Sequence, residues 1–271
     1  MNASFVLHCL DAALASAHAA GKVLAEGAFR RHAAESKSAT TDLVTRYDRA
    51  SEEIVCAELR RRFPSHRILA EESGDHGGRS DEPRWIIDPL DGTTNFAHGL
   101  PLFSISIACE WEGQVHVGVV HAPALGWTFS AARGHGAYRN GERLSVSPCD
   151  AIERALLVTG FPYDRKTARE NNFAQFFALK RRAQGIRRLG SAALDLSLVA
   201  SGSLDGYWEM KLKPWDIAAG LLIAQEAGAT TTDWQGQPVS LKLGEVLCAG
   251  PTLHRELLAV LRTVEHGQFS V

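Results

Sequence analysis

The sequence predicts a layered α/β protein, because its two halves contain different kinds of segment. The first half opens with two helical segments and continues with five strand-like runs separated by turn residues. The second half, from about residue 141, alternates strand-like and helical segments. Sheets and helices stacked in layers bury the apolar faces of both kinds of segment. We therefore expect a single domain over residues 1–271 with two lobes, an α+β lobe at 1–140 and an α/β lobe at 141–271.

The elements of the first lobe follow from side-chain periodicity. Residues 5–29 are rich in alanine at helical spacing, and residues 48–63 place Ile54, Val55 and Leu59 on one helix face. Alternating or purely apolar runs predict the strands, which cover residues 68–70, 84–87, 104–110, 115–121 and 126–132. This order predicts a largely antiparallel sheet under two helices.

In the second lobe, short apolar runs precede helical segments. The helix over residues 217–227 has the clearest boundaries, with Pro214 and Asp216 at its start and Gly228 just past its end. The other expected strands are 144–147, 156–159, 206–209 and 246–249, and the other expected helices are 171–182, 192–201 and 254–261. Strand and helix therefore alternate through this lobe.

Composition excludes several classes of protein. The chain has 271 residues, of which 45% are hydrophobic, so it can bury a substantial core. Its formal net charge of −2 gives no general attraction to nucleic acid or to anionic membranes. Its five cysteines include no Cys-x-x-Cys pair, so we expect free thiols and not a disulfide framework or a zinc site. No segment is long and apolar enough for a membrane span, and we expect a cytoplasmic location without membrane contact.

The most informative stretch is residues 85–96, which read Trp-Ile-Ile-Asp-Pro-Leu-Asp-Gly-Thr-Thr-Asn-Phe. Asp88 and Asp91 follow a buried strand, where two carboxylates repel each other unless cations lie between them. A hard divalent ion such as Mg²⁺ removes that repulsion and also takes phosphate oxygens as ligands. Gly92 lets the backbone approach a ligand, and the start of a helix favours a bound phosphate. The alternative is a pair of simple Asp-Pro and Asp-Gly turns. The candidate caps of the following helix are Thr93, Thr94 and Asn95.

Two more acidic sites favour the metal interpretation. Glu71 and Glu72 follow the short strand 68–70, so either side chain can join Asp88 from a neighbouring strand. Their alternative is a pair of exposed loop glutamates. Asp216 stands at the start of the helix over residues 217–227, where it either caps its own helix or directs a carboxylate at a metal.

These segments together resemble the inositol monophosphatase family of Mg²⁺-dependent, lithium-sensitive phosphatases. Its two signatures match residues 85–96 and the Trp-Asp-x-Ala-Ala-Gly pattern at 215–220. Lesser family elements match in order at 42–48, 70–73, 189–193 and 207–210, so the resemblance covers roughly residues 20–260. It implies a five-layered α-β-α-β-α sandwich with the metals between the lobes, and a homodimer.

The resemblance also implies two or three Mg²⁺ ions in each active site. By position, Glu71, Asp88 and the backbone carbonyl of Leu90 hold the first ion, and Asp88, Asp91 and Asp216 hold the second. One ion lowers the pKa of a bound water and the other stabilises the leaving alkoxide. No phosphoenzyme is needed.

A threonine hydroxyl held by an aspartate orients and deprotonates the attacking water in this family. The matching residues are Thr93 and Asp48, and Glu71 is counted with them as catalytic. The alternative for Asp48 is an exposed position on its helix, or the N-cap of that helix.

Substrate contacts also come from the resemblance. The backbone N–H groups of Gly92 and Thr93 take the phosphate, while Ala192, Glu209 and Asp216 face the ring hydroxyls of a small phosphorylated polyol. Glu209 is the best specificity candidate, because a buried acceptor rejects analogues that lack the matching hydroxyl. Its alternative is a strand residue that faces solvent.

The expected activity is therefore hydrolysis of inositol monophosphate to inositol and phosphate, with Lys37 on a loop near the site. Residues 211–214 resemble the bacterial members of the family, and residues 160–164 offer no serine where some members contact inositol. Histidinol phosphate, fructose bisphosphate, 3′-phosphoadenosine phosphate and NADP stay open as alternative substrates.

A basic segment at residues 180–188 supports a different kind of function. Five of its nine residues are lysine or arginine, which can contact RNA or an acidic protein surface. Some bacterial relatives act as regulatory partners in ribosomal RNA transcription, so contact with RNA or a transcription factor is the rival hypothesis. A solvated helix end is the simpler alternative.

Overall fold

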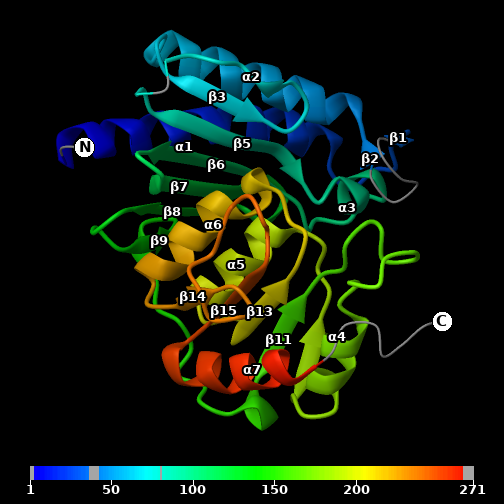
Figure 1. Ribbon diagram of the computed structural model, residues 1–271. Coiled ribbons are helices and arrows are strands. Elements are labelled where there is room, and N and C mark those ends of the chain that lie inside the picture. Colours follow the sequence, from blue (N-terminus) through cyan, green and yellow to red (C-terminus); the bar gives the residue numbers. More distant parts are fainter. Residues whose placement is uncertain (1–2, 37–42, 80, 265–271) are drawn as a thin grey trace.

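Five layers of helices and sheets make up the computed structural model, which describes residues 3–36, 43–79 and 81–264. Helices α1 and α2 cover one face of an eight-stranded sheet, and α5 and α6 lie between this sheet and a five-stranded one (Figure 1). Helices α4 and α7 lie on the far side of the second sheet. The expected α-β-α-β-α sandwich is confirmed. The helices are α1 (Ala3–Gly27), α2 (Arg46–Arg62), α3 (Thr93–Ala97), α4 (Phe173–Lys180), α5 (Ala192–Ala200), α6 (Pro214–Glu226) and α7 (Pro251–Thr263).

The eight-stranded sheet has the order β10-β9-β8-β7-β6-β5-β3-β4. All neighbours run antiparallel except β3 and β5, which are parallel, so the expectation of a largely antiparallel sheet is confirmed. Its strands are β3 (Arg67–Ala70), β4 (Gly74–Asp75), β5 (Arg84–Asp91), β6 (Ser104–Trp111), β7 (Gln114–Ala122), β8 (Trp127–Ala132), β9 (Ala137–Arg139) and β10 (Glu142–Arg143).

The five-stranded sheet has the order β12-β11-β13-β15-β14. Strand β11 runs parallel to β12 and β13, whereas β15 runs antiparallel to β13 and β14. Its strands are β11 (Leu156–Thr159), β12 (Gly185–Arg187), β13 (Gly206–Glu209), β14 (Thr230–Thr232) and β15 (Val246–Ala249). A separate hairpin pairs β1 (Glu35–Ser36) with β2 (Leu43–Val44).

One predicted strand is wrong. Residues 144–147 form no strand, and the N–H of Val146 instead donates to the carbonyl of Ala227 at the end of α6. Strand β10, just before this segment, still belongs to the first sheet. The division into lobes at residue 140 stays a prediction.

Helix boundaries follow local chemistry that the sequence analysis assigned to the wrong residues. The N-cap of α2 is Thr45, and Asp48 occupies the third helical position of the same capping box, so the N-cap alternative for Asp48 is wrong. Helix α3 begins after Gly92, whose φ of 93° is left-handed, and no side chain caps it. Helix α4 begins only at Phe173, because Asn172 has a φ of 69° and cannot continue a right-handed helix.

The central helices are the most buried part of the fold. Every residue of α5 is buried, and so is the run from Ile217 to Ala224 in α6, since both helices meet a sheet on two sides. The five cysteines are free thiols, as expected. None of the helices in the described part of the chain is both long and apolar enough to span a bilayer.

Candidate functional site

Three elements bring acidic side chains to the end of β5. Asp88 and Asp91 lie in the last four residues of β5, where the pairing with β6 shifts register. The parallel strand β3 ends beside β5, and the N–H of Glu71 donates to the carbonyl of Ile87 at 3.2 Å. The start of α6, which carries Asp216, is fixed to β6 by a 3.0 Å hydrogen bond from Ser106 Oγ to the carbonyl of Trp215.

These carboxyl groups perturb one another. Burial raises the pKa of Asp88 well above its usual range, and Glu71, Asp91 and Asp216 raise it further. Burial also raises the pKa of Asp216, again with help from Asp91 and Glu71. The pKa of Asp91 rises to about 6, mainly through burial. Four acids from three elements therefore share one poorly solvated space, which is unfavourable unless protons or cations neutralise them.

The carboxylate oxygens contact protein groups. Asp88 hydrogen-bonds to Glu71, which raises its pKa, and Asp88 Oδ1 also accepts from the N–H of Leu90 at 3.0 Å. Asp216 Oδ2 accepts from the N–H of Lys213 at 2.7 Å, so Asp216 contributes to the cap of its own helix from the third helical position, as Asp48 does in α2. Across the described residues, no three His, Cys, Asp or Glu side chains are already arranged as a metal-binding group. The hard oxygen donors nevertheless match the ligand preference of Mg²⁺.

The start of α5 holds the side chain of Asp91 through hydrogen bonds. Its Oδ2 accepts from Ser191 Oγ at 2.6 Å and from the N–H of Ala193 at 2.8 Å. Ser191 is also the N-cap of α5, with its Oγ accepting from the N–H of Leu194. The N–H of Ala192 contributes as well, since it lowers the pKa of Asp91. The start of α5 therefore fixes the orientation of the Asp91 carboxylate.

Thr93 and Asp48 form a directly hydrogen-bonded pair. Thr93 Oγ1 lies 2.9 Å from Asp48 Oδ1 and 2.9 Å from the carbonyl of Leu90. The other oxygen of Asp48 accepts from both the N–H and the Oγ1 of Thr45, each at 2.7 Å. Asp48 is fully buried, so the alternative of an exposed helix position is wrong. Because a hydroxyl has one proton, Thr93 can donate to one of its two acceptors at a time and keeps lone pairs for another donor.

Glu209 ends β13 and is half-buried. Its Oε2 accepts from the hydroxyl of Tyr207 at 3.0 Å, so it is not the freely solvated strand residue of the alternative interpretation. Burial raises its pKa to about 7, while Tyr207 and Arg188 act in the opposite direction. A carboxyl group in this setting favours a ligand that donates a hydrogen bond to it, because water solvates the group poorly when no donor is present.

The sequence profile of the inositol monophosphatase family matches residues 7–266. This chain belongs to the inositol monophosphatase family. A protein of Pasteurella multocida named Nus factor SuhB is 43% identical over 261 residues, which cover 96% of this chain and 98% of that protein. An inositol-1-monophosphatase of Synechocystis is 44% identical over 227 residues, 84% of this chain and 79% of that one. The structure of the inositol monophosphatase from Anabaena (Nostoc) sp. PCC 7120 superimposes with a TM-score of 0.88 at 42% identity, covering 96% and 97% of the two chains. The resemblance read from the sequence is confirmed, and the chain is a phosphatase of this family.

Several residues that shape this phosphatase site were missed in the sequence. Ser191 lies in a matched family segment, but its only local signal is a serine before a helical run, which predicts a cap and nothing more. Asn95 donates from Nδ2 to the carbonyls of Leu102 and Leu189, at 2.6 and 2.7 Å, and so joins the α3 region to the approach to α5. Arg188 carries the charge that lowers the pKa of both Asp91 and Glu209.

The basic side chains of residues 180–188 are solvated, as the simpler alternative predicts, but the segment is a helix end only at Lys180, because residues 185–187 form β12. All five of its basic side chains are exposed, and Arg182 pairs with Glu153 at 3.3 Å. Helix α4 ends at Lys180, inside this segment. The basic side chains are Lys180, Arg181, Arg182, Arg187 and Arg188.

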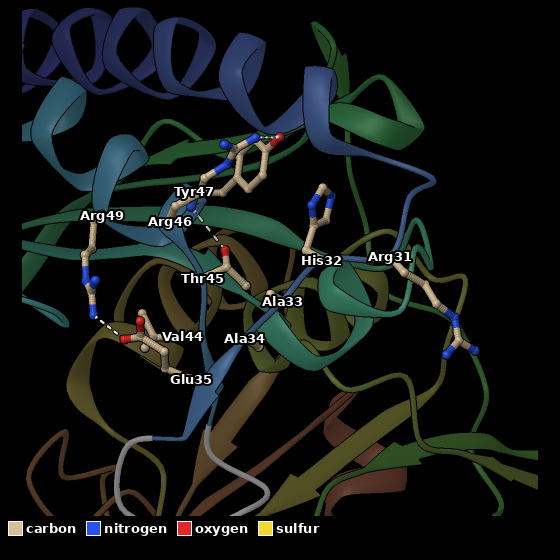
Figure 2. A pocket seen from close by; sticks show the side chains of 10 residues that line it. All are labelled: Arg31, His32, Ala33, Ala34, Glu35, Val44, Thr45, Arg46, Tyr47 and Arg49. Atoms are coloured by element: carbon tan, nitrogen blue, oxygen red, sulfur yellow. Dashed lines mark hydrogen bonds and ion pairs between the residues drawn. The ribbon is translucent and has the colours of Figure 1, made fainter.

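A pocket of about 400 Å³, lined in part by Thr45, lies between the β1–β2 hairpin and the start of α2 (Figure 2). Its three guanidinium groups point in different directions: Arg46 reaches the hydroxyl of Tyr47 at 3.2 Å, and Arg49 pairs with Glu35 at 2.9 Å, while Arg31 extends away from both. These groups therefore do not converge on one phosphate. The predicted positions of Lys37 and of Asp42, which begins one family element, lie outside the described residues.

Proposed function

We propose that the chain is a Mg²⁺-dependent phosphomonoesterase that hydrolyses inositol monophosphate to inositol and phosphate by direct attack of water. The observation that carries this proposal is the cluster of the buried Asp88 and Asp91 with the half-buried Glu71 and Asp216, beside the hydrogen-bonded pair of Thr93 and Asp48. The names of the Synechocystis and Anabaena relatives support the same substrate.

The acidic side chains fit Mg²⁺ in number and chemistry. Glu71, Asp88 and the carbonyl of Leu90 would hold one ion, and Asp88, Asp91 and Asp216 a second, with room in the family pattern for a third. Bound Mg²⁺ would lower the pKa of water and stabilise the leaving oxygen. Each ion would also relieve the mutual repulsion that raises the pKa of these acids.

The protein's own part in water activation falls to Thr93 and Asp48. With its proton donated to Asp48 Oδ1, the hydroxyl of Thr93 presents a lone pair to a water molecule and orients it. As the water attacks phosphorus, its proton passes to Thr93 while the hydroxyl proton moves to Asp48, and the ester P–O bond to the inositol oxygen breaks. The released oxygen takes a proton from solvent water, and Asp48 later returns the relayed proton to solvent. Thr45 stabilises the aspartate beforehand through two hydrogen bonds to the other oxygen.

The chain's remaining site residues bind and orient the ester. The left-handed turn at Gly92 directs its own N–H and that of Thr93 toward the phosphate, where the first N–H groups of a helix have no partner within it. Glu209, Asp216 and the region of Ala192 face the polyol hydroxyls. The N–H of Ala192 already serves Asp91, so Ala192 contacts the substrate through its other atoms.

The metal assignment is tested by Asp91→Asn and Asp216→Asn. Each should lower turnover by about a hundredfold or more in a folded protein, because each removes charge that stabilises the transition state. Asp11→Asn, a change of the same charge on the exposed face of α1, is the matched control. Unchanged turnover in either site variant, or activity that persists in a chelator, would refute the assignment. Inhibition by lithium, a homodimer and a cytoplasmic location belong to the same proposal.

The substrate is tested with a panel of esters in the presence of Mg²⁺. Inositol monophosphate should be hydrolysed with the highest kcat/KM among it, histidinol phosphate, fructose bisphosphate, 3′-phosphoadenosine phosphate and NADP. If phosphate is released slowly from inositol monophosphate and rapidly from another of these esters, inositol monophosphate is the wrong substrate. The phosphatase mechanism would not be affected.

A second role as a regulatory interaction partner is favoured by the relative named Nus factor SuhB and by the exposed basic residues at 180–188. Binding of RNA or a transcription factor by this segment should survive Asp91→Asn. It should weaken when Arg181 and Arg182 are changed to glutamate, with turnover retained. Loss of binding in the Asp91 variant alone would contradict this second role.

A further inference from the structure

We propose that Gly160 determines specificity in this phosphatase, because its missing side chain leaves the space in which the carboxylate of Glu209 is held. The proposal rests on the proposed contact of Glu209 with a substrate hydroxyl. It concerns a residue that touches neither the acidic metal site nor the Thr93–Asp48 pair, and it adds to the site a position that acts only through another side chain.

Gly160 follows β11 directly and faces the last residue of β13. The two strands are parallel and pair Leu157 with Gly206, Val158 with Tyr207 and Thr159 with Trp208, so the next step along brings Gly160 beside Glu209. A Cβ atom placed on Gly160 would overlap Oε1, Oε2 and Cδ of Glu209. Each of these atoms would lie well under 3.0 Å from the Cβ, a separation that Cβ contacts in proteins essentially never show. The carboxylate therefore occupies the position that any side chain at residue 160 needs.

The backbone of Gly160 does not itself require glycine. The φ of Gly160 is not left-handed, so alanine can adopt this backbone conformation without strain. Glycine is needed here for space alone. A substitution should consequently act on Glu209 and not on the local fold.

A buried asparagine prevents the two strands from moving apart. Asn172 Nδ2 donates to Thr159 Oγ1 at 2.9 Å and to the carbonyl of Gly160 at 2.7 Å. Its Oδ1 accepts from Trp208 Nε1 at 2.8 Å, and Thr159 Oγ1 donates to the carbonyl of Trp208. One side chain thus joins the end of β11 to the residue before Glu209. Asn172 holds a left-handed φ of 69°, a conformation that asparagine adopts more readily than most residues.

The locked backbone decides which group yields. Since Gly160 cannot retreat from β13, a methyl group at this position must displace the carboxylate of Glu209, which ends a flexible side chain. Displacement would stretch or break the 3.0 Å hydrogen bond from the hydroxyl of Tyr207 and turn the carboxylate away from its present direction. The hydrogen bonds that hold Asp91 and Thr93 come from other elements and would remain.

The experiment compares wild type with Gly160→Ala on two esters. Inositol monophosphate carries ring hydroxyls, whereas p-nitrophenyl phosphate has none. We expect kcat/KM for inositol monophosphate to fall about tenfold or more, chiefly through KM, with kcat/KM for p-nitrophenyl phosphate within about twofold of wild type. Gly185→Ala is the matched control, since Gly185 lies on β12 of the same sheet, has no left-handed φ and does not face Glu209. It should change neither value.

A double-mutant cycle separates failure of this inference from failure of the proposed function. In a Glu209→Ala background, Gly160→Ala should have no further effect on selectivity, because the displaced group is gone. If Glu209→Ala lowers selectivity for inositol monophosphate and Gly160→Ala does not, this inference is overturned alone. If Glu209→Ala leaves selectivity unchanged, the proposed role of Glu209 fails and the inference with it. An equal loss on both esters in a Gly160→Ala protein with unchanged Tm would also overturn it.

Discussion

Replacing Asp91 by asparagine should stabilise the metal-free protein while it lowers turnover by about a hundredfold or more. Asp91 is buried, with 9% of its surface exposed, and shares its site with Glu71, Asp88 and Asp216. Asparagine has nearly the same shape and keeps an oxygen that can accept from Ser191 Oγ and the N–H of Ala193. The change therefore removes a buried charge with little loss of packing.

The size and sign of the effect follow from the pKa of Asp91, which rises from 3.8 to about 6 mainly through burial. The folded protein holds this proton more tightly than the unfolded chain does. Stability tied to this carboxyl is thus fully present below pH 3.8 and is lost as the pH rises through about 6. A tenfold change in proton affinity corresponds to about 1.4 kcal/mol, so the full loss is about 3 kcal/mol. For a chain of this length, that is a change in Tm of about 5 °C.

Urea unfolding of the metal-free protein at two pH values measures this effect. Asp91→Asn should raise the free energy of unfolding by about 3 kcal/mol at pH 8 and by almost nothing near pH 4. Addition of Mg²⁺ at pH 8 should stabilise the wild type more than the variant, since the variant keeps the ligands of the first ion but lacks one carboxylate ligand of the second. The exposed Asp11→Asn should stay within about 0.5 kcal/mol of wild type at both pH values. A variant less stable than wild type at pH 8, or a gain that does not depend on pH, would refute the reasoning.

Three further predictions concern single side chains. Thr93→Ala should lower kcat by about a hundredfold or more because the hydroxyl bonded to Asp48 is lost, whereas Thr94→Ala, at the exposed next position, should not; equal turnover in the two variants would exclude Thr93 from water activation. Ser191→Ala should raise the Mg²⁺ concentration for half-maximal activity about tenfold to a hundredfold, with kcat largely recovered at saturation, because Asp91 loses its 2.6 Å partner; an unchanged Mg²⁺ titration would contradict this. Burial lowers the pKa of His121 from 6.5 to about 4. The stability that depends on neutral His121 is therefore present above pH 6.5 and is lost as the pH falls toward 4, by about 2 kcal/mol at pH 5. His121→Gln should remove this part of the pH dependence of urea unfolding.

Long, strongly periodic elements could be predicted from the sequence, and short ones could not. The segments read as helices at 48–63 and 217–227 agree with α2 and α6 to within a few residues. Strands β10, β12 and β14 are two or three residues long, too short for a periodic pattern to form. The wrong strand at 144–147 shows a related limit, because alternating apolar residues indicate an extended, half-buried segment but not a neighbouring strand with which to pair.

The sequence predicted that a side chain caps the start of α2 but indicated the wrong residue. Asp48 has the side chain of an N-cap, yet Thr45 occupies that position and Asp48 accepts from it. Which of two good caps is used depends on where the chain enters the helix. Asp48 instead bonds to Thr93, which lies 45 residues away in the sequence.

By itself the sequence determined the chemistry of the Asp88–Gly92 turn. Two carboxylates, a proline and a glycine within five residues at a strand end predict an acidic turn that approaches a ligand, since these are local properties of the chain. Only the tertiary structure decided what stands around that turn. The pairing of Asp91 with Ser191, 100 residues on, and the fit of Glu209 into the space at Gly160 depend on strand register and helix placement, which arise from packing across the whole molecule and leave no local pattern.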